Sequence, residues 1–234
     1  MTIKRSRAIW ILVGLLMGTV PAWAQPSRGY YERDGAFRLH VGAFQPEGDS
    51  EYWDEKFVGF TGEIDDFENV SIGADYLWSL NRNVGLLFTG NYFSGDSTQA
   101  YRGFVDNFGD RIRHDTTLDI ASFTGGFLFS PLGPDAPVIP YAGAGAGLYS
   151  WRLEEDGDFI AANDDIFNAT LESDGLAFGY FGLVGLEVPI SQRVSVFAEG
   201  RWTVADDELE GDLEGFGDID LSGREFMAGI SWNL

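Results

Sequence analysis

The connections between eight alternating segments constrain the fold of this chain more than any other feature of its sequence. Each segment alternates large apolar residues with small or polar ones, which is the pattern of a strand with two unlike faces. The segments span about 35–46, 67–80, 83–95, 115–130, 138–152, 174–188, 193–205 and 221–234. Short connections (79–83, 131–137, 189–193) alternate strictly with long ones (46–66, 95–114, 152–173, 206–220). An up-and-down barrel in an outer membrane has this arrangement, with tight turns at one end and long loops at the other.

The two faces of the segments indicate which side meets hydrocarbon. The large apolar faces carry almost no charge in mid-segment, and the opposite faces are rich in Gly and polar residues. A soluble all-β domain is the alternative, but a soluble barrel would line its interior with large apolar groups, whereas small residues suit a narrow eight-stranded barrel. In the fourth segment Asp119 falls on the Phe face, so either a bulge intervenes or Asp119 lies above the membrane. We therefore predict an all-β fold, an eight-stranded antiparallel up-and-down transmembrane β-barrel with short periplasmic turns and long extracellular loops.

The N-terminus has the features of a secretory signal peptide. Lys4, Arg5 and Arg7 precede the apolar run 8–20, and Ala22-Trp23-Ala24 supplies small residues for cleavage. The run is shorter than the roughly 20 residues of a membrane-spanning helix. We predict a signal peptide at 1–24, a short periplasmic lead-in at 25–34 and a barrel at 35–234, exported by the Sec pathway to the outer membrane of a Gram-negative-type cell.

Composition excludes several classes of protein. The chain has 15 Lys and Arg against 37 Asp and Glu, a net charge of −22, so phosphates of nucleic acids would be repelled. It contains no Cys, which excludes disulfides and Cys-ligated metals. Strong acidity can indicate disorder, but an aromatic content of 15% argues against it.

Aromatic residues mark both ends of the predicted strands. Indole and phenol rings prefer the headgroup layer of a membrane, because one end is apolar and the other can hydrogen-bond. The predicted girdles consist of Trp78, Phe129 and Trp232 on the periplasmic side and Tyr92, Phe178 and Trp202 on the opposite side.

Several stretches resemble a known superfamily. They are the leader, the run PYAGAGAGLY at 140–149, the stretches GLEVPI at 185–190 and VFAEGRW at 196–202, and the alternating C-terminal segment. Together they resemble the small outer-membrane β-barrels, a superfamily that includes OmpA-, OmpX- and OmpW-like proteins, over essentially all of the mature chain. The resemblance implies recognition of the C-terminal strand by the outer-membrane assembly machinery. Such barrels usually end in Phe, and this chain departs conservatively with Leu234.

Charged residues fall on the face that we predict to line the lumen. Unpaired charges in a narrow interior are costly, so we hypothesise a charge network that plugs the pore. Its members are Arg38, His40, Asp75, Glu187, Glu199, Arg201 and Glu225. A water-lined conduit is the alternative, since acids outnumber arginines in this set.

The long loops hold most of the acidic residues. They could bind Ca²⁺ or Mg²⁺ loosely beside lipopolysaccharide, or be solvated without a specific ligand. The stretch 154–158 (EEDGD) lacks the ligand spacing of an EF-hand, and we predict no ordered metal site and no other cofactor. The second loop differs, because it carries Arg102, Arg111, Arg113 and His114. These residues could contact lipopolysaccharide phosphates or form salt bridges with the acidic loops.

The sequence favours a structural or surface-interaction role whose partners are outer-membrane lipids and lipopolysaccharide. A narrow channel for small or hydrophobic molecules is the alternative that the OmpW-like resemblance implies. A lipid-modifying enzyme is disfavoured, because only His40 and His114 are present and no Ser motif accompanies either.

Overall fold

The computed structural model describes residues 34–105, 108–160 and 165–234. The predicted signal peptide and all of the lead-in except Asp34 lie outside these residues. Among the residues described, no helix is long and apolar enough to cross a membrane.

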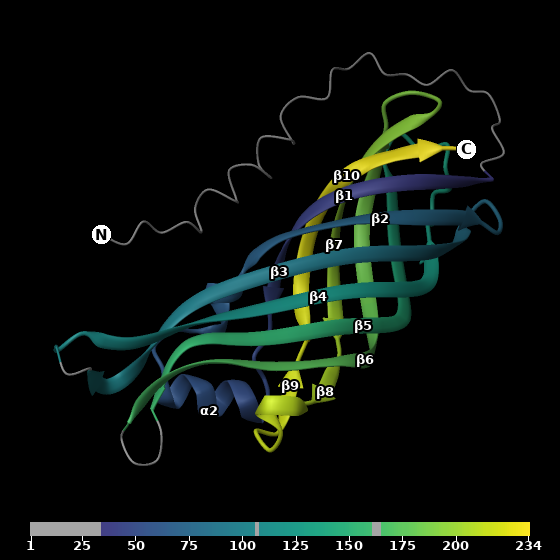
Figure 1. Ribbon diagram of the computed structural model, residues 1–234. Coiled ribbons are helices and arrows are strands. Elements are labelled where there is room, and N and C mark those ends of the chain that lie inside the picture. Colours follow the sequence, from purple (N-terminus) through teal and green to yellow (C-terminus); the bar gives the residue numbers. More distant parts are fainter. Residues whose placement is uncertain (1–33, 106–107, 161–164) are drawn as a thin grey trace.

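Eight antiparallel strands close into a barrel in the order β1-β10-β7-β6-β5-β4-β3-β2, so each strand pairs with its neighbour along the chain and β1 pairs with β10. The strands are β1 (Gly35–Pro46), β2 (Asn69–Ser79), β3 (Val84–Val105), β4 (Arg111–Phe129), β5 (Ile139–Ile160), β6 (Ile166–Pro189), β7 (Val194–Val204) and β10 (Gly223–Asn233). The C-terminus lies at the end with the short turns, opposite the helix α2 (Figure 1). The predicted fold class is therefore confirmed.

The strands β3 to β6 are longer than the sequence analysis predicted. Much of the expected loops 95–114 and 152–173 is strand, and the β5–β6 pairing runs without a break to Ile160 and Ile166. These strands extend past the rest of the barrel (Figure 1). The charges at 95–114 and 152–173 suggested loops, but alternate residues there are buried, as in Leu153 between Arg152 and Glu154.

Strands β3 to β6 form a four-stranded wall that protrudes from the barrel, called the protruding wall below. Its outer face changes from apolar to polar along its length. Asp119, Arg152 and Asp174 are register partners on β4, β5 and β6 and form one row on the outer face. Towards the short turns the outer face is apolar, with Phe123 and Leu176 exposed, and beyond the row it is polar and charged. A wall that passes from hydrocarbon into water needs such an exchange, because water favours a polar exterior and hydrocarbon an apolar one.

The position of Asp119 is resolved by this row. The β4–β5 register is continuous from His114 to Phe129, so no bulge shifts the phase of the fourth strand. Asp119 stays on the outer face, where its carboxylate accepts a hydrogen bond of 2.8 Å from the Tyr92 hydroxyl. The alternative with a bulge is therefore wrong.

The first and fourth long connections contain structure of their own. The first holds α2 (Glu51–Gly59) and the 3-10 helix η1 (Ile64–Phe67), and the last holds the short hairpin of β8 (Asp206–Glu208) and β9 (Asp218–Asp220) with η2 (Gly211–Leu213) between them. Thr61 satisfies the free edge of β3 with two hydrogen bonds to the Ala100 backbone, of 2.8 and 3.0 Å. On the other edge, the Glu210 N–H donates to the Ser173 hydroxyl at 3.0 Å. A neighbouring connection thus contacts each edge of the protruding wall, at Ala100 and at Ser173, which restricts pairing with another strand there.

Candidate functional site in the barrel interior

Arg38 lies at the centre of the polar groups inside the barrel. Its guanidinium donates to the Tyr141 hydroxyl at 2.7 Å and lies 3.9 Å from Asp75 and 3.7 Å from Glu199. The ring of Phe197 stacks on the guanidinium with its centroid 3.6 Å from Cζ. Arg38 is only 1% exposed, so both its charge and its planar faces are matched by protein groups.

Arg201 forms the second cationic centre. It donates to Glu199 at 3.1 Å and to the Thr89 hydroxyl at 3.4 Å, and its Cζ lies 5.1 Å from the centroid of the Phe181 ring. Thr89 in turn donates to Asp75 at 2.7 Å. Glu199 and Asp75 therefore link the two arginines into one network.

The remaining predicted lumen residues are also buried. His40 Nδ1 lies 3.5 Å from Asp75. Glu225 accepts hydrogen bonds from the Ser71 hydroxyl and, at 3.0 Å, from the Asn91 amide. Glu187 is buried on β6 near the short turns. All seven predicted members point inward. Direct contacts and the shared Thr89 and Tyr141 hydroxyls join five of them, Arg38, His40, Asp75, Glu199 and Arg201. Glu225 interacts electrostatically with Arg201, and Glu187 with Arg38.

Glycines on the inner face make room for the aromatic members of the network. A Cβ at Gly185 would lie 2.4 Å from the Tyr141 ring, and one at Gly229 would lie 2.7 Å from the Phe197 ring. Gly145 does the same for Phe181. The Gly-rich inner faces noted in the sequence are therefore the complement of large rings on neighbouring strands.

Apolar layers lie on both sides of the network. On the side of the short turns, a cluster of buried residues contains Leu77, Leu87, Leu128 and Leu183. On the opposite side, a larger cluster begins with Phe44, Phe93 and Ile120. Between the network and this larger cluster is a cavity of about 20 Å³, lined in part by Arg201 and Glu225, a volume that fits about one water molecule.

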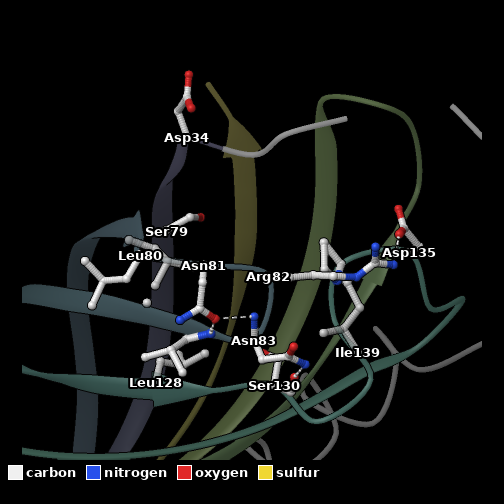
Figure 2. Close-up of a pocket in the computed structure, with 14 residues that line it drawn as sticks. Asp34, Ser79, Leu80, Asn81, Arg82, Asn83, Leu128, Ser130, Asp135 and Ile139 are labelled. Atoms are coloured by element: carbon white, nitrogen blue, oxygen red, sulfur yellow. Dashed lines mark hydrogen bonds and ion pairs between the residues drawn. The ribbon is translucent and has the colours of Figure 1, made fainter. Parts of the chain in front are cut away.

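The end with the short turns contains a cavity with a volume of about 240 Å³. Its rim is held by an ion pair between Arg82 and Asp135 and by the Asn83 side chain, which donates to the Ser130 carbonyl at 2.7 Å (Figure 2). Leu77 and Leu128 line the cavity and belong also to the apolar layer below the network. The cavity is a vestibule that ends on that layer.

The opposite end of the interior is covered by α2. Trp53 is fully buried and packs with its ring centroid 5.3 Å from that of Phe67, and its indole N–H donates to the Asp220 carbonyl at 3.3 Å. The same apolar cluster includes Leu118 and Trp151 from the protruding wall. The core of the barrel thus continues into the extramembrane part, with α2 as its lid.

A buried ion pair fastens α2 to the wall. Lys56 pairs with Glu155 on β5, and the Tyr52 hydroxyl donates to the same carboxylate. Burial opposes ionisation of Glu155, but Lys56 and the two hydrogen bonds outweigh it and lower the pKa of Glu155. Burial lowers the pKa of Lys56, and burial together with Glu155 raises the pKa of Tyr52.

His114 lies beside this ion pair. Its ring stacks on Phe159 with a centroid distance of 5.3 Å and meets Phe60 edge-on at 4.5 Å. Neither ring nitrogen has a hydrogen-bond partner in the part of the chain that the structure describes. Burial and the Lys56 charge lower the pKa of His114 to about 4, so the ring is neutral at pH 7.

The interpretation of the Arg-rich second loop needs one correction. His114 is only 2% exposed and faces the interior, so it is not available to lipopolysaccharide. Arg102, Arg111 and Arg113 are exposed, and Arg102 donates to the Phe60 carbonyl at 2.6 Å. For these three arginines, contact with lipopolysaccharide stays a prediction.

Two further predictions concern the surface. The girdle residues Trp78, Tyr92, Phe129, Phe178 and Trp202 are exposed on the barrel, and Trp232 stacks on Phe37 with centroids 6.4 Å apart. Among the described residues, no three His, Cys, Asp or Glu side chains are grouped to hold a metal ion. Loose binding of Ca²⁺ or Mg²⁺ at the acidic loops stays a prediction.

Sequence reasoning missed two groups of residues. Tyr141, Phe181 and Phe197 share the inward phase of their strands with the predicted charges, so that phase was the signal for them. Lys56 gave no signal, because it is one charge among many in a connection, and its partner Glu155 was assigned to a solvated loop.

Comparisons with known proteins place this fold. No protein-family model matches the sequence, and no curated protein matches it. The structure is similar to that of the outer membrane protein OprG from Pseudomonas aeruginosa, at 12% identity over 88% of this chain and 98% of that one, with a TM-score of 0.54. Neisserial surface protein A, NspA, is 12% identical over 86% of this chain and 96% of that one, with a TM-score of 0.49. The likeness to OprG, at 12% identity, concerns the fold alone. The chain therefore has the fold of the small outer-membrane β-barrels, as the resemblance in its sequence implies.

Proposed function

We propose that this protein is a non-catalytic outer-membrane barrel with a structural or surface-interaction role and an interior that does not conduct ions. The observation that carries the proposal is the sequence of three layers inside the barrel. An apolar layer, a paired charge network and a second apolar layer under α2 follow one another along the axis. An ion would have to displace buried, paired charges to pass.

The non-catalytic part of the proposal is supported by the positions of both histidines. His40 lies next to Asp75 inside the network, and His114 lies under α2 with its nitrogens unpartnered. Both imidazoles are buried, and among the described residues no Ser hydroxyl is hydrogen-bonded to either of them. A base for acyl transfer needs a nucleophile within hydrogen-bond reach.

Conductance in planar lipid bilayers tests the interior. We expect the purified protein to give no steady single-channel openings, since the charged and apolar layers leave room for about one water molecule between them. A variant of Trp53, such as Trp53→Ala, should not conduct either, because the network below remains. Steady openings of the unmodified protein would contradict the proposal and favour the second candidate.

That second candidate is a narrow channel for hydrophobic molecules. One observation favours it: the buried cluster beneath α2 is apolar and includes Phe44, Phe93, Ile120, Tyr149 and Trp151, side chains that would suit an apolar solute. The charged network below this cluster argues against a continuous axial path for such a solute.

The membrane position of the barrel is tested by a depth-dependent substitution. Phe123 and Thr117 both lie on the outer face of β4, on opposite sides of the Asp119 row. Phe123→Arg should lower the free energy of unfolding in lipid vesicles by about 2–4 kcal/mol, whereas Thr117→Arg should change it by about 0–1 kcal/mol. Urea titrations followed by tryptophan fluorescence measure both. Equal costs at the two sites would mean that the row does not mark the membrane boundary.

A further inference from the structure

The interface between α2 and the protruding wall contains a buried histidine that has no role in the proposed function. His114 is buried among rings, with both nitrogens unpartnered, directly beside the Lys56–Glu155 ion pair. Two neighbouring buried side chains, Gln99 and Thr116, also lack hydrogen-bond partners for their polar atoms. Gln99 is the register partner of His114, and Thr116 is that of Glu155. Polar groups left without hydrogen bonds in this way destabilise the interface between α2 and the wall.

The charges around His114 come from every element packed against it. Lys56 faces it from α2, Glu155 from β5 and Tyr101 from β3, while Asp115 is its neighbour on β4. Tyr52, also on α2, donates to the Glu155 carboxylate. Glu155 is the buried carboxylate of this group, and it is already paired with Lys56 and Tyr52. A proton on His114 would place a second buried cation beside Lys56 with one shared carboxylate. Like charges at such a site repel, and the aromatic walls offer no acceptor for the imidazolium.

We propose that α2 is an acid-released cap: protonation of His114 frees the helix from the wall and exposes the apolar cluster beneath it. Release of α2 withdraws Trp53 from this cluster and lets water reach the His114 ring. It also exposes the apolar residues that Trp53 covers, which changes the surface that the cell presents in acid. The charge network deeper in the barrel stays in place, so this cap works whether or not the barrel conducts.

The direction of the pH dependence follows from the two states of His114. In the capped state its pKa is about 4, and in the open state the ring has the ordinary value of 6.5. The open state therefore takes up a proton between pH 6.5 and pH 4 while the capped state does not, and the cap loses stability over that window. Between pH 7.5 and pH 5.0 the linkage raises the opening constant by about 30-fold. Glu155, whose pKa is lowered, contributes only below this range.

The chain has no Cys, so single reporter cysteines measure the opening directly. Thr116→Cys places a thiol at a side chain with 0% exposure under α2, and Val58→Cys places one at a side chain with 79% exposure on the outer side of α2. Each variant, folded in lipid vesicles, is reacted with a charged methanethiosulfonate reagent from pH 7.5 to pH 5.0. The ratio of the two rates cancels the pH dependence of the thiol and reports the opening constant.

We expect this ratio to rise by about 30-fold on acidification, and by less than about threefold when His114→Gln is added. His114→Phe, which keeps the ring stacking but cannot take a proton, should behave like His114→Gln. It controls for a folding defect caused by the Gln side chain. Asp156→Asn, which removes an exposed carboxylate from the same wall, should leave the rise intact. Boiling-dependent gel shifts at each pH show that the barrel itself stays folded. A ratio that does not change with pH, or that rises equally without His114, overturns the proposal.

Discussion

Replacing Arg201 with Met should lower the free energy of unfolding by about 3–5 kcal/mol, the cost of removing one partner from a buried ion pair. Arg201 is buried, and it donates to Glu199 and Thr89. Methionine has a comparable volume, so the loss comes from the carboxylates left behind and not from a cavity. With Arg201 gone, Arg38 is the remaining guanidinium beside Asp75 and Glu199.

Urea unfolding in lipid vesicles, followed by tryptophan fluorescence, measures this loss. Arg82→Met is the matched control, because Arg82 pairs with Asp135 at an exposed turn, where ion pairs contribute about 0–1 kcal/mol. Adding Glu199→Gln to Arg201→Met should recover part of the stability, since it removes one of the uncompensated charges. A change below about 1 kcal/mol in Arg201→Met would refute a stabilising network, and the lumen would then be better described as a hydrated conduit.

For this network, the sequence predicts which residues face inward but not which of them make contact. A period of two places every second residue of a strand on the same face, so Glu199 and Arg201 had to share a face with Phe197 once β7 was recognised. The pattern therefore predicts which residues enter the lumen. It does not predict which of them meet, because contact across the barrel depends on the stagger between strands. Arg38 and Tyr141 lie 103 residues apart in the sequence, and only the closed barrel brings them together.

The protruding wall could not be predicted in the same way. Its alternation continues from the membrane part, but the meaning of the two faces reverses at the row of Asp119, Arg152 and Asp174. A single rule that assigns apolar residues to the outside fails beyond this row, so the sequence pattern alone predicts loops for these stretches. The local sequence pattern does not predict the α2 cap for a related reason. The residues that bury this helix, such as Glu155, come from strands that are distant in the sequence.

Replacing Gly145 with Ala should lower the free energy of unfolding by about 3 kcal/mol and reduce the fraction of the protein that folds into a compact barrel. A methyl group at this position would lie 2.2 Å from the Gly125 carbonyl oxygen and 2.6 Å from Gly126 Cα. Both are backbone atoms of β4, the strand paired with β5, so no change of side-chain rotamer relieves the contact. Relief requires the two strands to move apart at the level of the charge network.

Gly182 provides the matched control for the same added methyl group. It lies on β6 opposite Ala144, one residue along β5 from Gly145, and a Cβ there meets nothing within 4 Å. Gly182→Ala should therefore fold as well as the unmodified chain or slightly better, because Ala loses less conformational freedom than Gly in a strand. The fraction of compact, unboiled band on a gel and the urea midpoint distinguish the two variants. If Gly145→Ala folds like Gly182→Ala, the inner face is looser than the close approach of β4 and β5 implies, and the glycines are then not required by the packing of rings around the two arginines.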